Sequence, residues 1–102
     1  MNFHLEERYL NIVKTILQAH FGNDAPAVYL FGSRATGNRI KKYSDIDLAI
    51  EFKNKDSLAS KLLLETAFEE SLLPYRVDIV DYNSCSADFR EIIDQTKIKL
   101  NL

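Results

Sequence analysis

The chain has 102 residues, 46% hydrophobic and 11% aromatic, which is enough apolar content for one globular domain and excludes a disordered polypeptide. Thirteen Lys and Arg stand against fifteen Asp and Glu, and this near balance argues against a protein that coats nucleic acid. The single cysteine, Cys85, excludes an intramolecular disulfide and a cysteine-based zinc site.

The sequence carries no sign of membrane insertion or secretion. No apolar stretch approaches the roughly 20 residues of a membrane-spanning helix, and the N-terminus lacks the pattern of a signal peptide. We therefore expect one domain over residues 1–102, in the cytoplasm and without a membrane partner.

The first elements follow from apolar spacing. Apolar residues recur at helical intervals between residues 5 and 17, so we predict an amphipathic helix that ends near Gly22. A short apolar run at 27–31 predicts a buried strand that Gly32 closes. One helical turn can follow, capped by Ser33.

The second half alternates strands and helices. Clean alternation of apolar with mostly polar residues predicts a strand at 45–52, and the largely apolar run at 75–80 predicts another. Asp56 or Ser57 should cap the helix between them, and Ser84 or Ser86 should open a last helix. The expected buried side of the middle helix comprises Leu58, Leu62, Ala67, Phe68 and Leu72. This order predicts an α+β fold in layers, with helices flanking a small mixed β-sheet.

Two aspartates lie two residues apart in the strand at 45–52. Because alternate side chains of a strand point the same way, Asp45 and Asp47 project together from one face. Two carboxylates so close repel each other unless a cation compensates, and Mg²⁺ prefers oxygen ligands. Taken alone, the pair is equally compatible with two solvent-facing residues of an edge strand.

A third carboxylate favours the metal site. Asp78 lies inside an apolar run, where a charge adds little to solubility. If its strand neighbours the earlier one, Asp78 joins the aspartate pair. Asp81 has the opposite parity at the end of the strand, and we interpret it as a turn residue or surface charge.

Gly32 and Ser33 form a turn that suits a phosphate. Glycine lets the backbone turn tightly, and the serine adds a hydroxyl and an amide at the start of a short helix. Without the aspartates, a glycine turn before a solvated basic loop is the simpler interpretation. The segment GSRATG at 32–37 opens like a P-loop, but Asn and Arg stand at 38–39 where the motif needs Lys followed by Ser or Thr, so the P-loop is rejected.

Three segments together resemble a known family: GSRA at 32–35, SDIDL at 44–48 and VDIV at 77–80. Their order and spacing resemble the minimal nucleotidyltransferases of the DNA polymerase β superfamily, also called kanamycin-nucleotidyltransferase-like. The resemblance covers residues 27–94, which is most of the chain.

The resemblance implies two-metal transfer of a nucleoside monophosphate from ATP or another nucleoside triphosphate to an acceptor hydroxyl, with release of pyrophosphate. By motif position, Asp45 and Asp47 would bind two Mg²⁺ ions. Asp78 would complete the catalytic metal site and help to deprotonate the acceptor.

The resemblance also implies a phosphate site and a partner. Gly32 and Ser33 would hold the β- and γ-phosphates, and Arg34 and Arg39 are candidate triphosphate contacts. Larger relatives carry an acceptor-binding domain for which 102 residues leave no room. The implied remedy is a small helical protein of the HEPN type, in a homo- or hetero-oligomer. In some such pairs the nucleotidyltransferase is an antitoxin that adenylylates a tyrosine of its partner toxin.

Two other function classes stand beside this hypothesis. One is a nucleotide-binding or partner-binding module without turnover, against which the presence of all three carboxylates counts. The other is a bare DNA-binding domain, against which the acidic balance and the lack of a helix-turn-helix pattern count. The sequence names neither the acceptor nor the preferred base.

Overall fold

A mixed β-sheet forms the centre of the computed structural model, which describes residues 4–37, 44–53 and 57–102. Its strands are β1 (Val28–Phe31), β2 (Ile46–Ile50), β3 (Val77–Asp81) and β4 (Ile98–Lys99), in the order β3-β2-β1-β4. β1 pairs antiparallel with β2 and β4, whereas β2 and β3 run parallel. A parallel pair needs a crossover connection, and the segment that contains α3 provides it.

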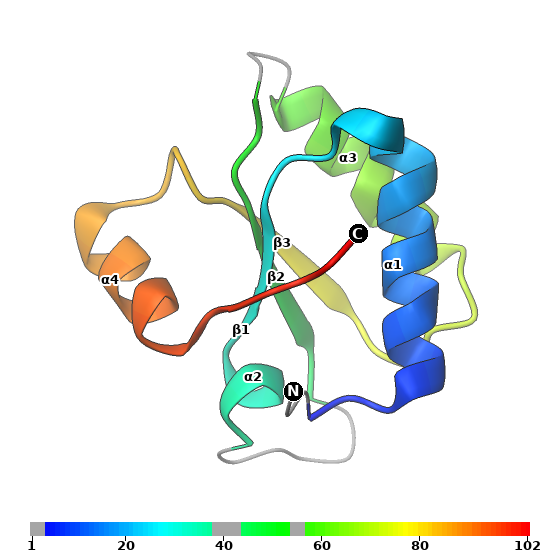
Figure 1. Ribbon diagram of the computed structural model, residues 1–102, viewed down its shortest axis with the longest axis horizontal. Coiled ribbons are helices and arrows are strands. Elements are labelled where there is room, and N and C mark those ends of the chain that lie inside the picture. Colours follow the sequence, from blue (N-terminus) through cyan, green and yellow to red (C-terminus); the bar gives the residue numbers. More distant parts are fainter. Residues whose placement is uncertain (1–3, 38–43, 54–56) are drawn as a thin grey trace.

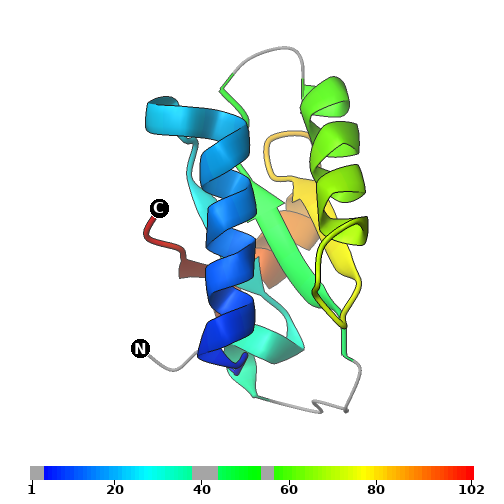
Figure 2. The ribbon, with the colours of Figure 1, turned by 90° about the vertical axis from the view of Figure 1, so that its right-hand side faces the viewer.

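Helices cover both faces of this sheet. They are α1 (Glu7–Phe21), η1 (Gly22–Asp24), α2 (Ser33–Thr36), α3 (Ser57–Glu69) and α4 (Ala87–Thr96). α1 and α3 lie on one face and α4 lies on the other (Figure 1). The turned view shows α1 and α3 side by side (Figure 2). The predicted α+β layer fold is confirmed.

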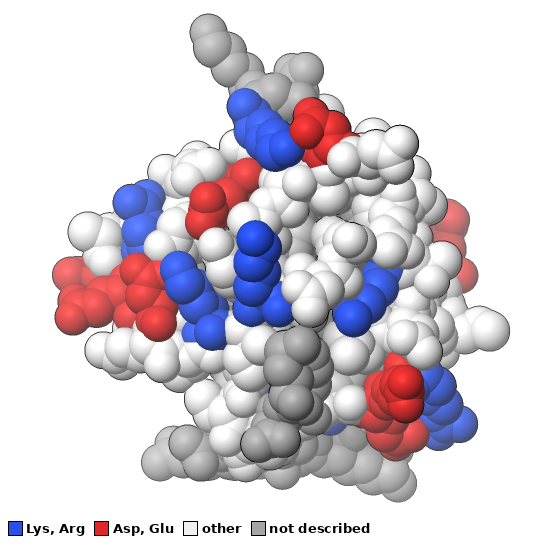
Figure 3. Space-filling model, in the orientation of Figure 1, with Lys and Arg blue, Asp and Glu red and all other residues white. Residues whose placement is uncertain are grey.

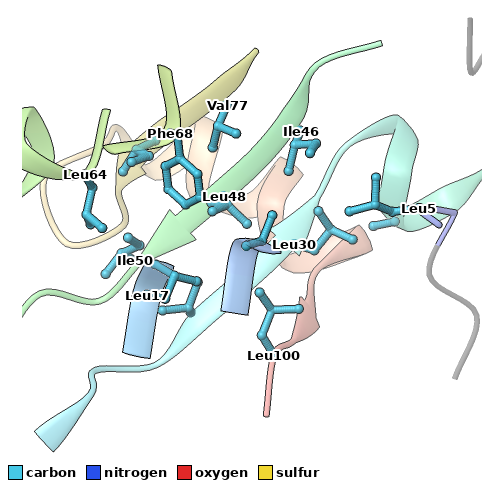
Figure 4. Close-up of a cluster of buried hydrophobic side chains, with 14 of the residues drawn as sticks. Leu5, Leu17, Leu30, Ile46, Leu48, Ile50, Leu64, Phe68, Val77 and Leu100 are labelled. Carbon is cyan, nitrogen blue, oxygen red and sulfur yellow. The ribbon is translucent and has the colours of Figure 1, made fainter. Parts of the chain in front are cut away.

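The main core lies between the sheet and the pair α1 and α3. Ile46, Leu48 and Ile50 of β2 are fully buried there, together with Leu17 of α1 and Leu64 of α3 (Figure 4). Full burial of each such side chain contributes about 1.5–3 kcal/mol. This core fixes which face of β2 turns away from α1 and α3, and the aspartates project from that other face.

A smaller cluster lies under α4. Ala49 of β2 and Phe31 of β1 are buried against Ile93 of α4. The ring of Phe89 meets the ring of Phe31 edge to face, with 6.0 Å between centroids. β2 is therefore covered on both faces near Ala49, while Asp45 and Asp47 lie at the beginning of the strand.

The predicted buried side of α3 is partly wrong. Leu58 and Leu62 are 70% and 56% exposed, and Leu72, which lies beyond the end of α3, is 90% exposed. Leu64 and Phe68 are the buried pair, and Ala67 is half-buried. α3 carries leucines on several faces, so spacing alone does not choose a stripe; contact with β3 chooses it.

The helix ends test the capping predictions. Gly22 ends α1 at φ 66°, as predicted. The Oγ of Ser86 accepts a hydrogen bond from the amide of Phe89 at 3.2 Å, which confirms Ser86 as the cap of α4. Ser33 is not a cap: Gly32 occupies the N-cap of α2 and Ser33 is its first residue. Asp56 lies outside the described residues.

Candidate functional site

The strand register brings two of the predicted carboxylates together. Asp47 of β2 is the direct partner of Asp78 in the parallel pairing of β2 with β3. Asp45 lies one residue before β2, at the spacing that directs its side chain to the same face as Asp47. The sequence-based condition for a three-carboxylate site, that the two strands be neighbours, is therefore confirmed.

The environment of Asp47 disfavours its charge. Burial first, and then the charges of Asp78 and Asp45, raise its pKa from 3.8 to about 6. Accumulated negative charge at a half-buried position is what a bound cation would relieve. Carboxylate oxygens in this number suit Mg²⁺, so Asp45 and Asp47 fit the ion that the resemblance implies.

Gly32 joins the phosphate turn to the carboxylates. Its φ of 74° lies in the region that glycine adopts without strain. A Cβ at this position would lie 2.5 Å from Oδ2 of Asp47, well inside van der Waals contact. The backbone that leads into Ser33 therefore runs directly against the carboxylate of β2, and only glycine fits there.

Asp78 has a partner that sequence reasoning missed. The Nε of Arg76 lies 3.1 Å from Oδ1 of Asp78; Arg76 is exposed and Asp78 is half-buried. Arg76 precedes Asp78 by two residues, so the two-residue period of strands places both on one face and could have revealed the pair. In residues 4–37, 44–53 and 57–102, no three acidic, histidine or cysteine side chains converge as a ready metal site. The ion pair uses Oδ1 of Asp78 and leaves Oδ2 as the oxygen that could serve as a third ligand.

The structure describes one of the two arginines that were predicted to contact the triphosphate. Arg34 is buried, and its guanidinium donates hydrogen bonds to the carbonyl oxygens of Ser44 and His4 and lies over the Tyr75 ring. Its role as a triphosphate contact stays a prediction. Arg39 lies outside the described residues.

Asp81 behaves as a turn residue, as interpreted from its parity. It is the last residue of β3, and its carboxylate accepts from the amide of Asn83 at 3.2 Å and the hydroxyl of Ser84 at 3.0 Å. It therefore shapes the connection to α4 and stands apart from the paired carboxylates.

The surface agrees with the charge balance. Acidic and basic side chains are interspersed over the face drawn in Figure 3. None of the helices in the described part of the chain is both long and apolar enough to cross a membrane.

Comparison with known proteins defines the class first. Residues 11–101 match the family model described as Polymerase beta, Nucleotidyltransferase. This match spans most of the chain, and the matched range includes the glycine turn and all three carboxylates, so the chain is a nucleotidyltransferase by fold and family.

Individual relatives narrow the class. The Haemophilus influenzae protein named Probable protein adenylyltransferase MntA is 46% identical over 89 residues, which are 87% of this chain and 75% of that protein. A solved structure described as a minimal nucleotidyltransferase is 30% identical, with a TM-score of 0.69 over 95% of this chain and 98% of its own. The chain belongs to the polymerase β nucleotidyltransferase family, as a member of the minimal type.

Two further structures share the fold at lower identity. The crystal structure of a toxin-antitoxin with AMP-PNP has a TM-score of 0.70 at 24% identity, and covers 87% of this chain and 69% of its own. The crystal structure of a mutant of the toxin-antitoxin MntA-HpeT has a TM-score of 0.68 at 21% identity, and the match covers 93% of this chain and 71% of that one.

Proposed function

We propose that the chain transfers AMP from magnesium-bound ATP to an acceptor hydroxyl and releases pyrophosphate. The observation that carries this proposal is the close approach of the Gly32 backbone to the Asp47 carboxylate, which leaves no room for a Cβ, with Asp78 as the strand partner of Asp47. A triphosphate on the turn would lie directly beside the carboxylates. The adenylyltransferase name of the Haemophilus relative supports AMP as the transferred group.

The chain's own residues would divide the work. Asp45 and Asp47 would hold both metal ions, and Gly32 and Ser33 would bind the β- and γ-phosphates through the turn. Bound Mg²⁺ would supply charge neutralisation along the triphosphate. Asp78 would complete the site and accept the proton of the acceptor hydroxyl. The acceptor oxygen then bonds to the α-phosphorus as the bond to pyrophosphate breaks.

We further propose a partner protein as acceptor, a small helical protein of the HEPN type. Two structures that share the fold are toxin-antitoxin complexes, which supports an antitoxin role here. Leu58, Leu62 and Leu63 of α3 are large and exposed, as expected of a chain that is covered by another protein.

The test is transfer of labelled AMP from ATP to a protein that copurifies with this chain. Asp45→Asn and Asp78→Asn remove one charge each and should reduce transfer by at least about a hundredfold, in the range of effects that removal of one stabilising group has in other sites. Asp81→Asn is the matched control, because it makes the same change on β3 at the opposite parity, and the asparagine Oδ1 keeps one of the two turn acceptors. Transfer that persists in both site variants would refute the mechanism.

A second candidate function is a nucleotide-binding subunit without turnover. The ion pair of Arg76 with Asp78, and the lack of a ready three-ligand site in the described residues, favour it. Calorimetry separates the two functions. Tight binding of magnesium-ATP with no pyrophosphate release, across candidate acceptors, would identify the binding subunit.

A further inference from the structure

Arg34 is the charged side chain that the fold buries, with 6% of its surface exposed; among the described residues no other charged side chain is buried. A guanidinium keeps its charge when buried, and its loss of water is costly unless hydrogen bonds replace that water. Nε and one terminal nitrogen donate to the carbonyl oxygen of Ser44 at 3.3 and 3.1 Å. The other terminal nitrogen donates to the carbonyl of His4 at 3.2 Å, and the guanidinium carbon lies 4.3 Å from the centroid of the Tyr75 ring.

These contacts join the segments that carry the site. Arg34 itself belongs to α2, directly after Gly32 and Ser33. The Ser44 carbonyl is part of the peptide that leads into Asp45, and Tyr75 lies in the segment that enters β3 shortly before Asp78. One buried side chain thus holds the phosphate turn, the start of the carboxylate strand and the approach to the third carboxylate.

The N-terminal segment closes the same junction from outside. The amide of His4 donates to the carbonyl oxygen of Arg34 at 2.8 Å. A Cβ on Gly37 would lie 2.7 Å from Cε1 of the His4 ring, so this glycine leaves the space that the ring fills. The His4 segment is therefore seated against α2 through its backbone, its ring and the Arg34 guanidinium.

We propose that Arg34 is a positioning residue that sets the phosphate turn at a fixed separation from the carboxylates, a role that rests on the proposed nucleotidyl transfer. The guanidinium is suited to this role because it is a planar fork whose two edges bind two carbonyls at once. A lysine ammonium concentrates its donors at one point and cannot reproduce both edges. The side chain acts through the peptide of Ser44 and Asp45, because its donors bind the carbonyl oxygens of Ser44 and His4.

The kinetic test compares Arg34→Met, Arg34→Lys and the matched control Arg8→Met, which alters an exposed arginine of α1. Displacement of a reacting group by about 1 Å costs on the order of a hundredfold, so kcat of both Arg34 variants should fall by about that factor. KM for ATP should change by less than about threefold, because the phosphate ligands themselves remain. If KM for ATP instead rises tenfold in Arg34→Met with kcat retained, and Arg34→Lys restores the wild-type KM, Arg34 is a triphosphate contact and the proposal is overturned.

A spectroscopic test separates this proposal from the proposed function. In the protein without nucleotide or metal, Arg34→Met should shift or broaden the backbone amide signals of Gly32 and Asp45 in ¹⁵N-edited NMR spectra, while that of Ile93 in α4 stays in place. Unchanged signals of Gly32 and Asp45 would overturn the positioning role. If the wild-type chain transfers no AMP, the proposed function fails, and the spectra still decide the role of Arg34. If Arg34→Met does not fold, Arg34→Lys carries the same comparison.

Discussion

Replacement of Asp47 by asparagine should stabilise the metal-free protein and abolish its metal-dependent activity. The carboxylate is half-buried, faces Asp78 across the strand pair and lies beside Asp45, so its charge is unfavourable in the folded state. Asparagine has nearly the same shape and carries no charge. The substitution therefore removes the repulsion and leaves the packing against Gly32 in place.

The magnitude follows from the pKa of Asp47. Its rise from 3.8 to about 6 corresponds to about 3 kcal/mol, which solvent screening at a half-buried position lowers to about 1–2 kcal/mol. Because the folded state binds the proton more tightly than the unfolded state, the penalty is absent below about pH 4. It grows from about pH 4, where the unfolded chain begins to lose the proton that the folded protein keeps, and levels off above the folded pKa near 6. Asp47→Asn should thus gain its advantage progressively between about pH 4 and pH 7 and keep it in basic solution.

The assay is urea unfolding of both proteins in EDTA at pH 4, 6 and 8. The free energy of unfolding should be equal at pH 4 and higher for Asp47→Asn at pH 8. Glu91→Gln is the matched control, since it removes a carboxylate from the exposed surface of α4 and should show no such trend. Added Mg²⁺ should stabilise the wild type and leave Asp47→Asn unchanged. A variant that is less stable than the wild type at pH 8 would refute the electrostatic argument.

Further predictions concern the backbone, a cap and the core. Gly32→Ala should reduce AMP transfer by at least about tenfold and cost about 2–4 kcal/mol, because a φ of 74° is strained for alanine and its Cβ would also lie 2.5 Å from the facing carboxylate oxygen. Gly22→Ala shares a positive φ but has open space around it, so it should cost only about 1 kcal/mol. Equal stability of the two variants in urea would contradict this. Ser86→Ala should lower the free energy of unfolding by about 1 kcal/mol through loss of the cap of α4, and an unchanged urea midpoint would count against it. Leu64→Ala should lower the free energy of unfolding by about 2–5 kcal/mol, and Leu62→Ala by less than about 0.5 kcal/mol. Comparable losses of thermal stability in the two variants would show that Leu64 does not belong to the buried side of α3.

Local patterns determined most of the elements. The run that became β1, the alternation that became β2 and the cap at Ser86 follow from spacing and side-chain chemistry alone. β4 escaped prediction because a strand of two residues is too short to show alternation. The buried side of α3 escaped as well, since leucines lie on several faces of the helix and only the contact with the sheet selects Leu64 and Phe68.

For the candidate site, too, local pattern determined some features and tertiary structure determined the others. The sequence by itself determined that Asp45 and Asp47 share a face, and that Asp78 and Asp81 lie on opposite faces of their strand, because the period of a strand is a local property. Only the tertiary structure decided that β2 and β3 are parallel neighbours with Asp47 opposite Asp78, since strand pairing depends on the path of the intervening chain. It also decided that the Gly32 backbone meets Asp47 and that Arg34 is buried. Both depend on the approach of segments distant in sequence, which no local pattern records.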